Sequence, residues 1–376
     1  MNATEKLNGV LSHIKSAFIG KDEIIDLLGI GLIARENAFL LGPPGTAKSA
    51  LVQHLSACIE GGKNFEYLLT RFTEPGELFG PFDIRKLKEG ELVTNTEGMM
   101  PEASLVFLDE IFNANSAILN SLLMALNERV FRRGKETKKI PALMFVGASN
   151  MLPEDEALHA LLDRFLIRIR CDYVDPDLLS ELLLAGWALE NGAVTEHPSI
   201  TPGDIKLLQQ TARTVDLSPV RKQYVDLVHN LRSTGIKVSD RRAVKIQNLV
   251  AASALMCNRR EAMLSDLWVL KYVWDTEEQI EILAGMIDHI IQKDTGSGIH
   301  PQALFNKAPD PEELIREVRS LQSKWIGEPL SFEEQNRVKD KLRYVQTRSS
   351  WIRNGEHQQY IQKEIESLWH SILQTV

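Results

Sequence analysis

The first half of the chain alternates short apolar runs with longer segments of helical periodicity. Residues 38–41, 105–108 and 143–148 are continuous apolar runs of the length expected for buried strands. Residues 65–72 have the composition of a further strand, and residues 166–170 alternate apolar and basic positions as an edge strand does. Helical patterns follow these runs. The pattern therefore predicts an α/β core built on a buried parallel sheet.

Helical periodicity accounts for most of the remaining positions. Residues 1–35 have a helical pattern that breaks near Gly20, and residues 204–291 contain no strand-like alternation of useful length. Segments rich in proline and glycine interrupt the helical pattern and mark boundaries. The predicted domains are an α/β core at 1–190, an all-α lid at 191–292, a linker at 293–311 and a C-terminal helical region at 312–376.

Two further segments have the pattern of β-hairpins. Residues 82–87 and 91–94 flank a charged turn that ends in Gly90, which is a hairpin signature. A second hairpin is expected near residues 130–140, with basic residues close to its turn. The first of these segments is too long for a plain connection between elements, so we expect it to be an ordered insertion.

Composition narrows the class of protein. Hydrophobic residues make up 44% of the 376 positions and charged residues 25%, which is ordinary for globular domains. The net charge of −8 provides no overall basic surface for nucleic acid. Three distant cysteines, Cys58, Cys171 and Cys257, favour a reducing compartment over a disulfide framework. Neither a signal peptide nor an apolar membrane span is evident, so we expect a cytoplasmic protein.

The segment from Gly42 to Ser49 carries the strongest chemical signal. It follows an apolar strand, precedes a helix and matches G-x-x-x-x-G-K-[ST], the Walker A phosphate loop. Backbone N–H groups and the helix N-terminus would surround the phosphates, Lys48 would reach the β- and γ-phosphates, and the Ser49 hydroxyl would bind Mg²⁺. The expected nucleotide contacts are Gly42, Pro43, Pro44, Gly45, Thr46, Ala47, Lys48, Ser49 and Ala50.

Two positions near this loop leave questions open. Position 47 is alanine where the strict motif has glycine, and alanine resists positive φ. We therefore expect Ala47 to have negative φ, as the first turn of a helix requires. Ile19 and Gly20 can lie against an adenine ring, but a helix boundary marked by glycine explains the pattern equally well.

Two later strand ends supply the polar groups of a hydrolytic site. Asp109 and Glu110 end the apolar run at 105–108, in the manner of a Walker B strand. Asp109 would hold Mg²⁺ through its waters, and Glu110 would polarise the attacking water. Asn150 ends the run at 143–148, where its amide can orient that water. Adjacent carboxylates at strand ends are common, and Asn150 can also be a simple turn former.

These elements occur in one order with Asp163-Arg164-Phe165 and with Ser239-Asp240-Arg241, and together they resemble an AAA+ ATPase module. The finer resemblance is to the MoxR family, and within it to the RavA-type branch. The motifs that carry it lie at 41–49, 70–72, 80–81, 100–103, 106–111, 126–129, 148–150 and 238–242. The resemblance covers residues 1 to about 292 closely.

The resemblance implies a P-loop NTPase core with a parallel sheet in the order 5-1-4-3-2, a hairpin inserted in helix 2, and an all-α lid. It also implies a homo-hexameric ring with ATP or ADP and Mg²⁺ bound between subunits. Arg164 resembles the finger that enters the neighbour's site, with Arg168 and Arg170 as alternatives. Arg241 resembles the lid arginine that senses the γ-phosphate, with Arg242 as its alternative.

RavA-type members carry a β-rich module within their C-terminal region, and here only the linker at 293–311 stands in that place. The resemblance further implies a partner with a von Willebrand factor A domain and a client protein. The expected function is Mg-ATP hydrolysis coupled to remodelling, or to metal-cofactor loading, of that client.

Two alternatives remain to ATP-driven remodelling. The first is a nucleotide-switched scaffold with little hydrolysis. The second is a DNA-stimulated translocase of the helix-2-insert clade, which only the basic residues of the two hairpins favour. The net charge of −8 makes nucleic acid an unexpected partner.

Overall fold

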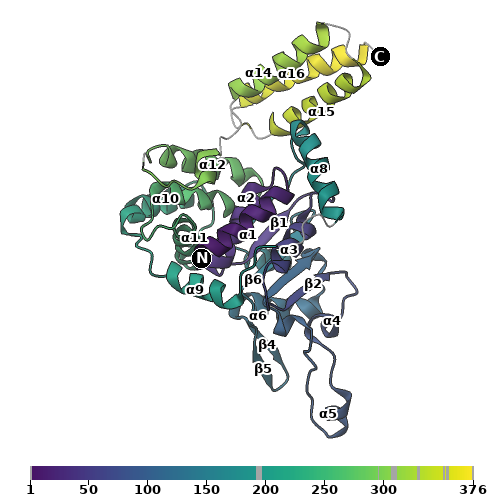
Figure 1. The fold of residues 1–376 in the computed structure, drawn as a ribbon, viewed down its shortest axis with the longest axis vertical. Coiled ribbons are helices and arrows are strands. Elements are labelled where there is room, and N and C mark those ends of the chain that lie inside the picture. The colour runs from purple at the N-terminus through teal and green to yellow at the C-terminus, as the bar shows by residue number, and fades with distance from the viewer. Residues whose placement is uncertain are drawn as a thin grey trace.

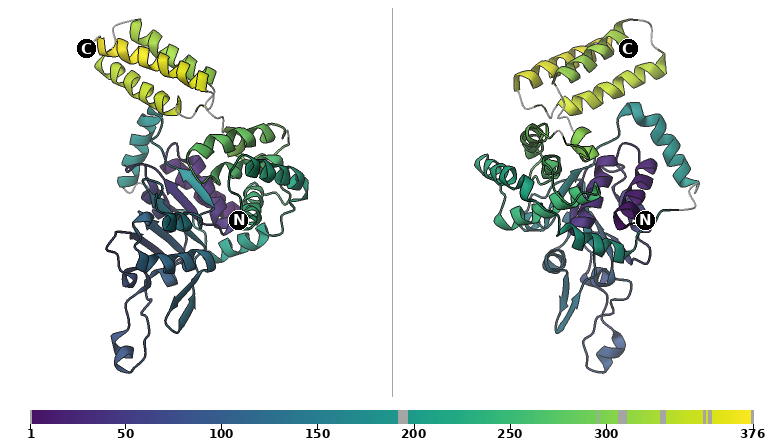
Figure 2. Two further views of the ribbon diagram at one scale, coloured as in Figure 1. Left: turned by 180° about the vertical axis from the view of Figure 1, so that it is seen from behind. Right: turned by 60° about the vertical axis from the view of Figure 1, so that its left-hand side comes forward.

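The computed structural model describes residues 2–191, 197–294, 296–305, 311–327, 331–349, 352 and 355–374. The sheet and its helices form the centre of the molecule, and the lid helices lie beside them (Figure 1). The C-terminal helices lie at one end of the long axis, and two narrow projections extend from the other. Figure 2 shows the same separation from two further directions.

Five parallel strands form the central sheet. Their spatial order is β2 (Asn64–Leu68), β3 (Leu105–Asp109), β6 (Met144–Ser149), β1 (Ala38–Leu41) and β7 (Ile167–Arg170). Numbering only these core strands along the chain gives 5-1-4-3-2, so the predicted order is confirmed. Every residue of β1 and β6 is buried, which explains why these strands are continuous apolar runs rather than alternating ones.

Side-chain N-caps start several of the core helices. Asn2 and Glu5 form a capping box at the start of the first helix, and the Asn115 side chain accepts the N–H groups of Ala117 and Ile118. The helical segments of the core are α1 (Ala3–Ala17), α2 (Asp22–Ala34), α3 (Lys48–Ala57), η1 (Met100–Glu102), η2 (Ile111–Asn113), α6 (Ser116–Glu128), α7 (Glu156–Leu162), η3 (Pro176–Leu178) and α8 (Leu179–Glu190).

The two projections confirm one predicted hairpin and modify the other. Strands β4 (Val130–Arg133) and β5 (Glu136–Lys139) pair antiparallel as expected. The insertion follows the short helix α4 (Pro75–Phe79), and only Phe82 and Thr94 form an antiparallel bridge in it. Its tip is the one-turn helix α5 (Ile84–Lys88).

The expectation of two strands at this tip was therefore wrong. The Asp83 side chain accepts the N–H groups of Arg85 and Lys86, which favours a helical turn over an extended strand. Arg133 joins the two projections, because its guanidinium donates to the Gly80 carbonyl at 2.8 Å and lies 3.8 Å from the centre of the Phe82 ring.

Helices joined by turns and loops make up the lid in its described residues. Its elements are α9 (Pro202–Ala212), η4 (Ser218–Val220), α10 (Arg221–Ser233), α11 (Asp240–Met256), η5 (Leu264–Tyr272) and α12 (Glu278–Ile291). Helix α9 packs on α1 and α2, so the lid is closely attached to the core. Part of the predicted boundary, residues 192–196, lies outside the described residues.

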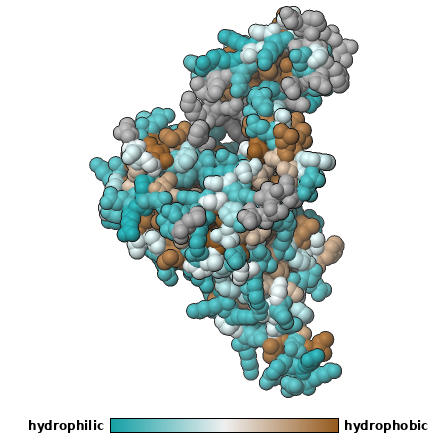
Figure 3. Space-filling model, in the orientation of Figure 1, coloured by the Kyte–Doolittle hydropathy of each residue, from teal (hydrophilic) through white to brown (hydrophobic). Residues whose placement is uncertain are grey.

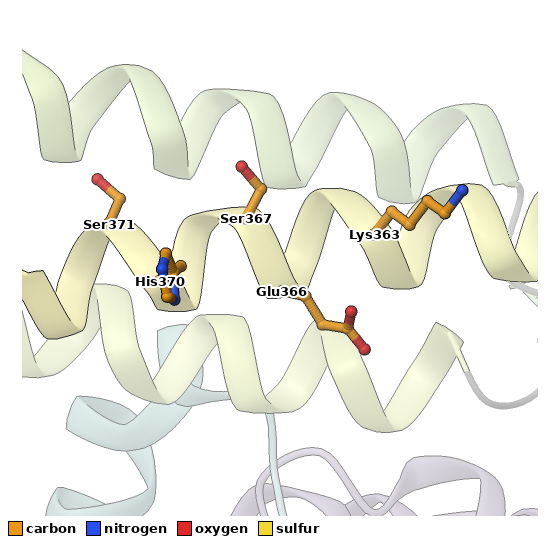
Figure 4. A pocket seen from close by; sticks show the side chains of 5 residues that line it. All are labelled: Lys363, Glu366, Ser367, His370 and Ser371. Atoms are coloured by element: carbon orange, nitrogen blue, oxygen red, sulfur yellow. The ribbon is translucent and has the colours of Figure 1, made fainter.

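The C-terminal unit has a hydrophobic core of its own. It consists of α14 (Pro311–Ile326), α15 (Phe332–Ser349) and α16 (Gly355–Gln374), which bury a cluster of leucine, isoleucine and valine side chains separate from the main core. A polar groove on α16, lined by Lys363, Glu366, Ser367, His370 and Ser371, is shown in Figure 4. All five residues belong to one helix, which lies at the far end of the molecule from the two projections.

Exposed apolar side chains gather at two places (Figure 3). One is the tip of the insertion, with Ile84, Leu87 and Leu92, and the other is α8, with Leu179, Leu183, Leu184 and Trp187. Contiguous exposed apolar surface commonly marks a site of protein contact. Among the helices that the structure describes, none combines the length and apolar character needed to cross a bilayer.

The predicted linker is not free of the rest of the chain. His300, just before the short helix α13 (Pro301–Phe305), is buried and stacks on the Trp268 ring at 4.8 Å. The Gln302 side chain donates to Asp26 of α2 at 2.8 Å. Residues 295 and 306–310 of this segment lie outside the described residues.

His300 gives the protein an acid-sensitive contact. Burial disfavours the imidazolium and lowers the pKa of His300 from 6.5 to about 4. As pH falls below 6.5 the unfolded chain takes up this proton, whereas the folded chain does not until about pH 4, so stability is lost across that window. We expect His300→Asn to reduce the loss of unfolding free energy between pH 7 and pH 5 by about 1–2 kcal/mol.

Urea unfolding at the two pH values measures this difference. Asparagine is neutral, and its carbonyl oxygen can accept the Gln302 N–H that His300 Nδ1 accepts at 3.2 Å. His289→Asn on the exposed face of α12 is the matched control and should retain the wild-type dependence. If the unfolding free energy of His300→Asn depended on pH as in the wild type, His300 would not be the source of the acid sensitivity.

Candidate active site

The phosphate loop leaves β1 at a point where only glycine fits. A Cβ atom added to Gly42 would lie 2.1 Å from the carbonyl oxygen of Cys171, which follows β7. Gly45 has φ +81°, a left-handed conformation that glycine adopts without steric cost. The chain then enters α3 at Lys48. The predicted order of strand, loop and helix is confirmed.

Ala47 corrects one expectation. Its φ is 65° and its ψ is 21°, so it is left-handed and not at the negative φ that we expected. Such a conformation costs an alanine about 1–2 kcal/mol. Two contacts offset this cost, because the Ala47 carbonyl accepts the Leu51 N–H at 3.0 Å in the first turn of α3 and the residue packs against the hydrophobic core.

Lys48 lies inside the loop with its ammonium group almost fully buried. Its Nζ donates to the carbonyl oxygens of Gly42 at 2.6 Å and Pro43 at 2.9 Å. It also approaches Asn150 Oδ1 at 3.3 Å. A buried ammonium is tolerated only when hydrogen-bonded, so the loop holds a positive charge where a phosphate would bind.

Ser49 and Asp109 meet at the start of α3, although they are far apart in the sequence. The Ser49 hydroxyl lies 3.2 Å from Asp109 Oδ2. A hydroxyl and a carboxylate oxygen are the hard ligands that Mg²⁺ prefers, beside waters and substrate phosphates. The pair therefore fits the ion predicted for it.

Glu110 and Asn150 form a second contact beside Lys48. Asn150 Nδ2 donates to Glu110 Oε1 at 2.7 Å. Glu110 has left-handed backbone torsions, with φ 49°, a strained conformation for a residue with a side chain. Burial, followed by the neighbouring Asp109 carboxylate, raises the pKa of Glu110. A carboxylate with a raised pKa is a better proton acceptor for a water molecule.

Three arginines were candidates for the finger, and they occupy different environments. Arg168 is 1% exposed and donates to Phe165, Leu162 and Asp275, so its guanidinium is committed within its own chain. Arg170 pairs with Asp172 at 3.0 Å and Glu277 at 3.1 Å. Arg164 pairs only with its neighbour Asp163 among the described ion pairs, and its side chain is 25% exposed.

The two lid candidates contact residues outside the phosphate loop. Arg242 is buried and joins Asp275 at 2.7 Å. Arg241 contacts the Asn127 side chain.

Asn127 follows Leu126, whose carbonyl accepts the Asn37 side chain at 3.2 Å. Asn37 also binds the Arg164 carbonyl, at 3.0 Å. Asn37 precedes β1 and Gly42 follows it, and the strand rise of about 3.3 Å per residue separates them by about 16 Å. The contact that Arg241 makes thus lies near the Asn37 end of β1, and its role at a nucleotide stays a prediction.

The segment at 171–178 adds contacts near the phosphate loop that the sequence did not predict. Tyr173 donates its hydroxyl to the Pro44 carbonyl at 3.3 Å, and Lys21 Nζ donates to the Asp172 carbonyl. A Cβ on Gly20 would lie 3.0 Å from Val174. No local motif marks these residues. The available signal was topological, since a segment that follows the strand beside β1 ends near the phosphate loop.

Comparison with known proteins gives two family matches. Residues 5–210 match a protein-family model described as the MoxR domain in MoxR–vWA–β-propeller ternary systems, and residues 218–287 match an AAA lid domain.

Individual relatives agree with these matches. An uncharacterised protein of Methanocaldococcus jannaschii is 33% identical over 93% of this chain and 90% of its own length. Chaperone MoxR1 of Mycobacterium tuberculosis is 26% identical over 47% of each chain. A crystal structure of a proposed ATPase from Cytophaga hutchinsonii, at 18% identity, covers 78% of this chain and 95% of its own with a TM-score of 0.62, which shows a shared fold.

The strain at Ala47 can be relieved by substitution. Ala47→Gly removes a left-handed alanine but adds backbone freedom to the unfolded chain, so we expect a net stabilisation of about 0.5–1 kcal/mol. Urea unfolding measures it. The matched control is Ala50→Gly in the right-handed first turn of α3, which should be destabilised by about 0.5–1 kcal/mol. If both substitutions were destabilising, the inference that Ala47 is strained would be contradicted.

Proposed function

The chain belongs to the MoxR family of AAA+ ATPases, and on this premise we propose that it hydrolyses ATP to ADP and phosphate in the presence of Mg²⁺. One observation carries the proposal. Lys48 contacts Asn150, Asn150 contacts Glu110, and Asp109 next to Glu110 contacts Ser49. Phosphoryl transfer to water uses a lysine, a hydroxyl and a carboxylate for Mg²⁺, a second carboxylate and a polar residue for the attacking water. Within one subunit, all these groups lie around a single loop.

Each of these residues has a distinct role in the proposed reaction. Lys48 and the loop N–H groups bind the β- and γ-phosphates. Ser49 and Asp109 would hold Mg²⁺, which neutralises charge on the phosphates when bound. Glu110 accepts a proton from the attacking water, and Asn150 keeps the Glu110 carboxylate and that water in line with the γ-phosphate.

We further propose that the site is completed by a second copy of the chain. Arg164 and the Arg241–Asn127 contact are both linked to Asn37, at the opposite end of β1 from the phosphate loop. The side-chain contacts of the two guanidinium groups, with Asp163 and Asn127, lie outside the phosphate loop of their own subunit. In a head-to-tail ring this edge faces the neighbour's loop, so both arginines would act in trans, and a homo-hexamer is the expected assembly.

The biological output we propose is conformational work on a client protein. The matched family model describes systems that contain vWA proteins, which supports a vWA-domain partner for this chain. The exposed apolar side chains of the insertion tip and of α8 are suited to protein contacts. Remodelling and metal-cofactor loading are both consistent with such contacts.

The translocase alternative is less well supported. Lys86 on the insertion pairs with Glu91 at 3.3 Å, and Lys138 on the second projection pairs with Glu102 at 3.0 Å. Acidic neighbours thus offset part of the basic charge that would have to attract phosphates. The nucleotide-switched scaffold differs from the proposed ATPase only in its rate of hydrolysis, so a turnover assay distinguishes the two.

Glu110→Gln separates binding from hydrolysis. Glutamine keeps the shape of the side chain but cannot accept a proton, so we expect wild-type ATP affinity with turnover reduced at least ~10²-fold. Phosphate release and ATP-binding calorimetry measure the two properties. Turnover at the wild-type rate in this variant would remove Glu110 from its role, and a wild type that binds ATP without turnover would favour the scaffold.

Mixing two inactive variants tests the shared site. We expect Arg164→Ala to lose ~10³-fold or more in turnover, because the γ-phosphate charge is no longer stabilised. Adding an equal amount of Glu110→Gln should restore up to about one quarter of wild-type turnover, since Arg164→Ala sites then receive an arginine from their neighbours. Arg168 is buried against Asp275 and its loss would disturb folding, so Arg170→Ala serves as the control and should retain turnover. No recovery on mixing would contradict action in trans.

A further inference from the structure

The segment at 171–178 lies between two parts of the nucleotide site. At one end it contacts the phosphate loop, through the Cys171 carbonyl beside Gly42 and the Tyr173 hydroxyl on the Pro44 carbonyl. Further along, Val174 and Leu178 lie against Gly20, where an added Cβ would be 3.0 Å and 3.6 Å from their methyl groups. The segment therefore runs from the phosphates toward the turn where the base is expected.

The far end of the same segment is attached to the C-terminal unit. Lys341 Nζ of α15 lies 2.8 Å and 3.0 Å from the two carboxylate oxygens of Asp175. It lies 2.7 Å from Asp177 Oδ2. The Lys341 side chain is only 15% exposed, so solvent screens these contacts less than it would at an open surface.

Lys341 and its two partners form an anchor for η3. Asp175 caps η3 by accepting the Asp177 N–H at 3.0 Å, so the ammonium group binds the residue that starts this turn. Although burial opposes the charge, the two carboxylates raise the pKa of Lys341, so it stays protonated at neutral pH. Helix α15 also packs directly on η3.

Resting on the function proposed above, we propose that Lys341 is a positioning residue for nucleotide binding. Its contacts with Asp175 and Asp177 hold the 171–178 segment in place as the base-side wall of the site. Nucleotide affinity thereby depends on the C-terminal unit, although no residue of that unit has to touch the nucleotide.

The loss of nucleotide affinity expected without Lys341 can be estimated from the fraction of chains in which the segment is in place. Without its anchor the segment spends part of its time away from Gly20, and apparent affinity falls in proportion to the fraction of chains in which the wall is formed. The net contribution of one typical hydrogen bond corresponds to about a three- to tenfold change in such an equilibrium. The chemical step involves other residues, so its rate constant should change little.

The experiment uses the full chain and three single substitutions. Lys341→Met removes the charge at similar volume, Lys341→Arg retains it, and Lys363→Met on the exposed face of α16 is the matched control (Figure 4). Calorimetry gives the Kd for ADP, and steady-state turnover gives KM and kcat. We expect Lys341→Met to weaken ADP binding and raise KM about three- to tenfold, with kcat within about twofold. Lys341→Arg and Lys363→Met should resemble the wild type.

A double substitution tests whether the effect passes through the carboxylates. Asp177→Asn should weaken ADP binding in the same direction, and combining it with Lys341→Met should add less than the sum of the two effects. Equal ADP affinity in Lys341→Met and the wild type would overturn the proposal. So would an equal loss in Lys363→Met, which would indicate general destabilisation of the C-terminal unit.

Hydrogen exchange separates this proposal from the proposed function. We expect ADP to slow amide exchange in peptides covering 42–49 and 171–178 of the wild type, and Lys341→Met to lose protection only at 171–178. Protection of both segments in Lys341→Met at the wild-type level would overturn the positioning role alone. A wild type in which ADP protects neither segment would overturn the proposed function, and the positioning role with it.

Discussion

The parallel pairing of β1 with strands on both sides is the constraint on which the active site depends. Leu41 is in register with Ser149 of β6 and with Arg170 of β7. The residues that follow these strands therefore emerge side by side at one edge of the sheet. Parallel pairing leaves no freedom in this arrangement, because a shift in register would separate the phosphate loop from Asn150.

Close packing at this edge also explains the unusual backbone of the site. The Cys171 carbonyl lies so near Gly42 that no side chain fits there, and Ala47 and Glu110 are held in left-handed conformations. Each such residue costs of order 1–3 kcal/mol, which the buried sheet around it must offset. These conformations hold the site residues in position, because the Glu110 carboxylate already contacts Asn150 without a substrate.

A second buried interaction joins the lid to the core. Arg168 of β7 and Arg242 of α11 share the Asp275 carboxylate. Burial alone would raise the pKa of Asp275, but the two arginines hold it below its ordinary value, so the carboxylate stays charged. Removing one partner from such a buried cluster leaves an uncompensated charge, so these two arginines contribute to the attachment of the lid to the core.

The sequence was sufficient to predict the structure wherever a local pattern determines the geometry. Buried strands, the phosphate loop and the Asp109–Glu110 strand end follow from apolar runs and fixed spacings, and the sheet order followed from the family resemblance. The sequence was insufficient where tertiary contacts decide. The left-handed Ala47 depends on the packing around the loop, the helical tip of the insertion depends on the single cap at Asp83, and the position of Arg241 depends on how the lid docks.

These positions suggest how the parts of the molecule divide their work. The edge that carries the phosphate loop has a lysine, two carboxylates and an amide, but Arg164 and Arg241 lie at the other edge of the same sheet. On the function proposed above, a single chain would hold the phosphate-binding groups at one edge and the two arginines at the other. Because the sheet separates the two edges by the length of β1, turnover would then depend on how neighbouring chains are placed.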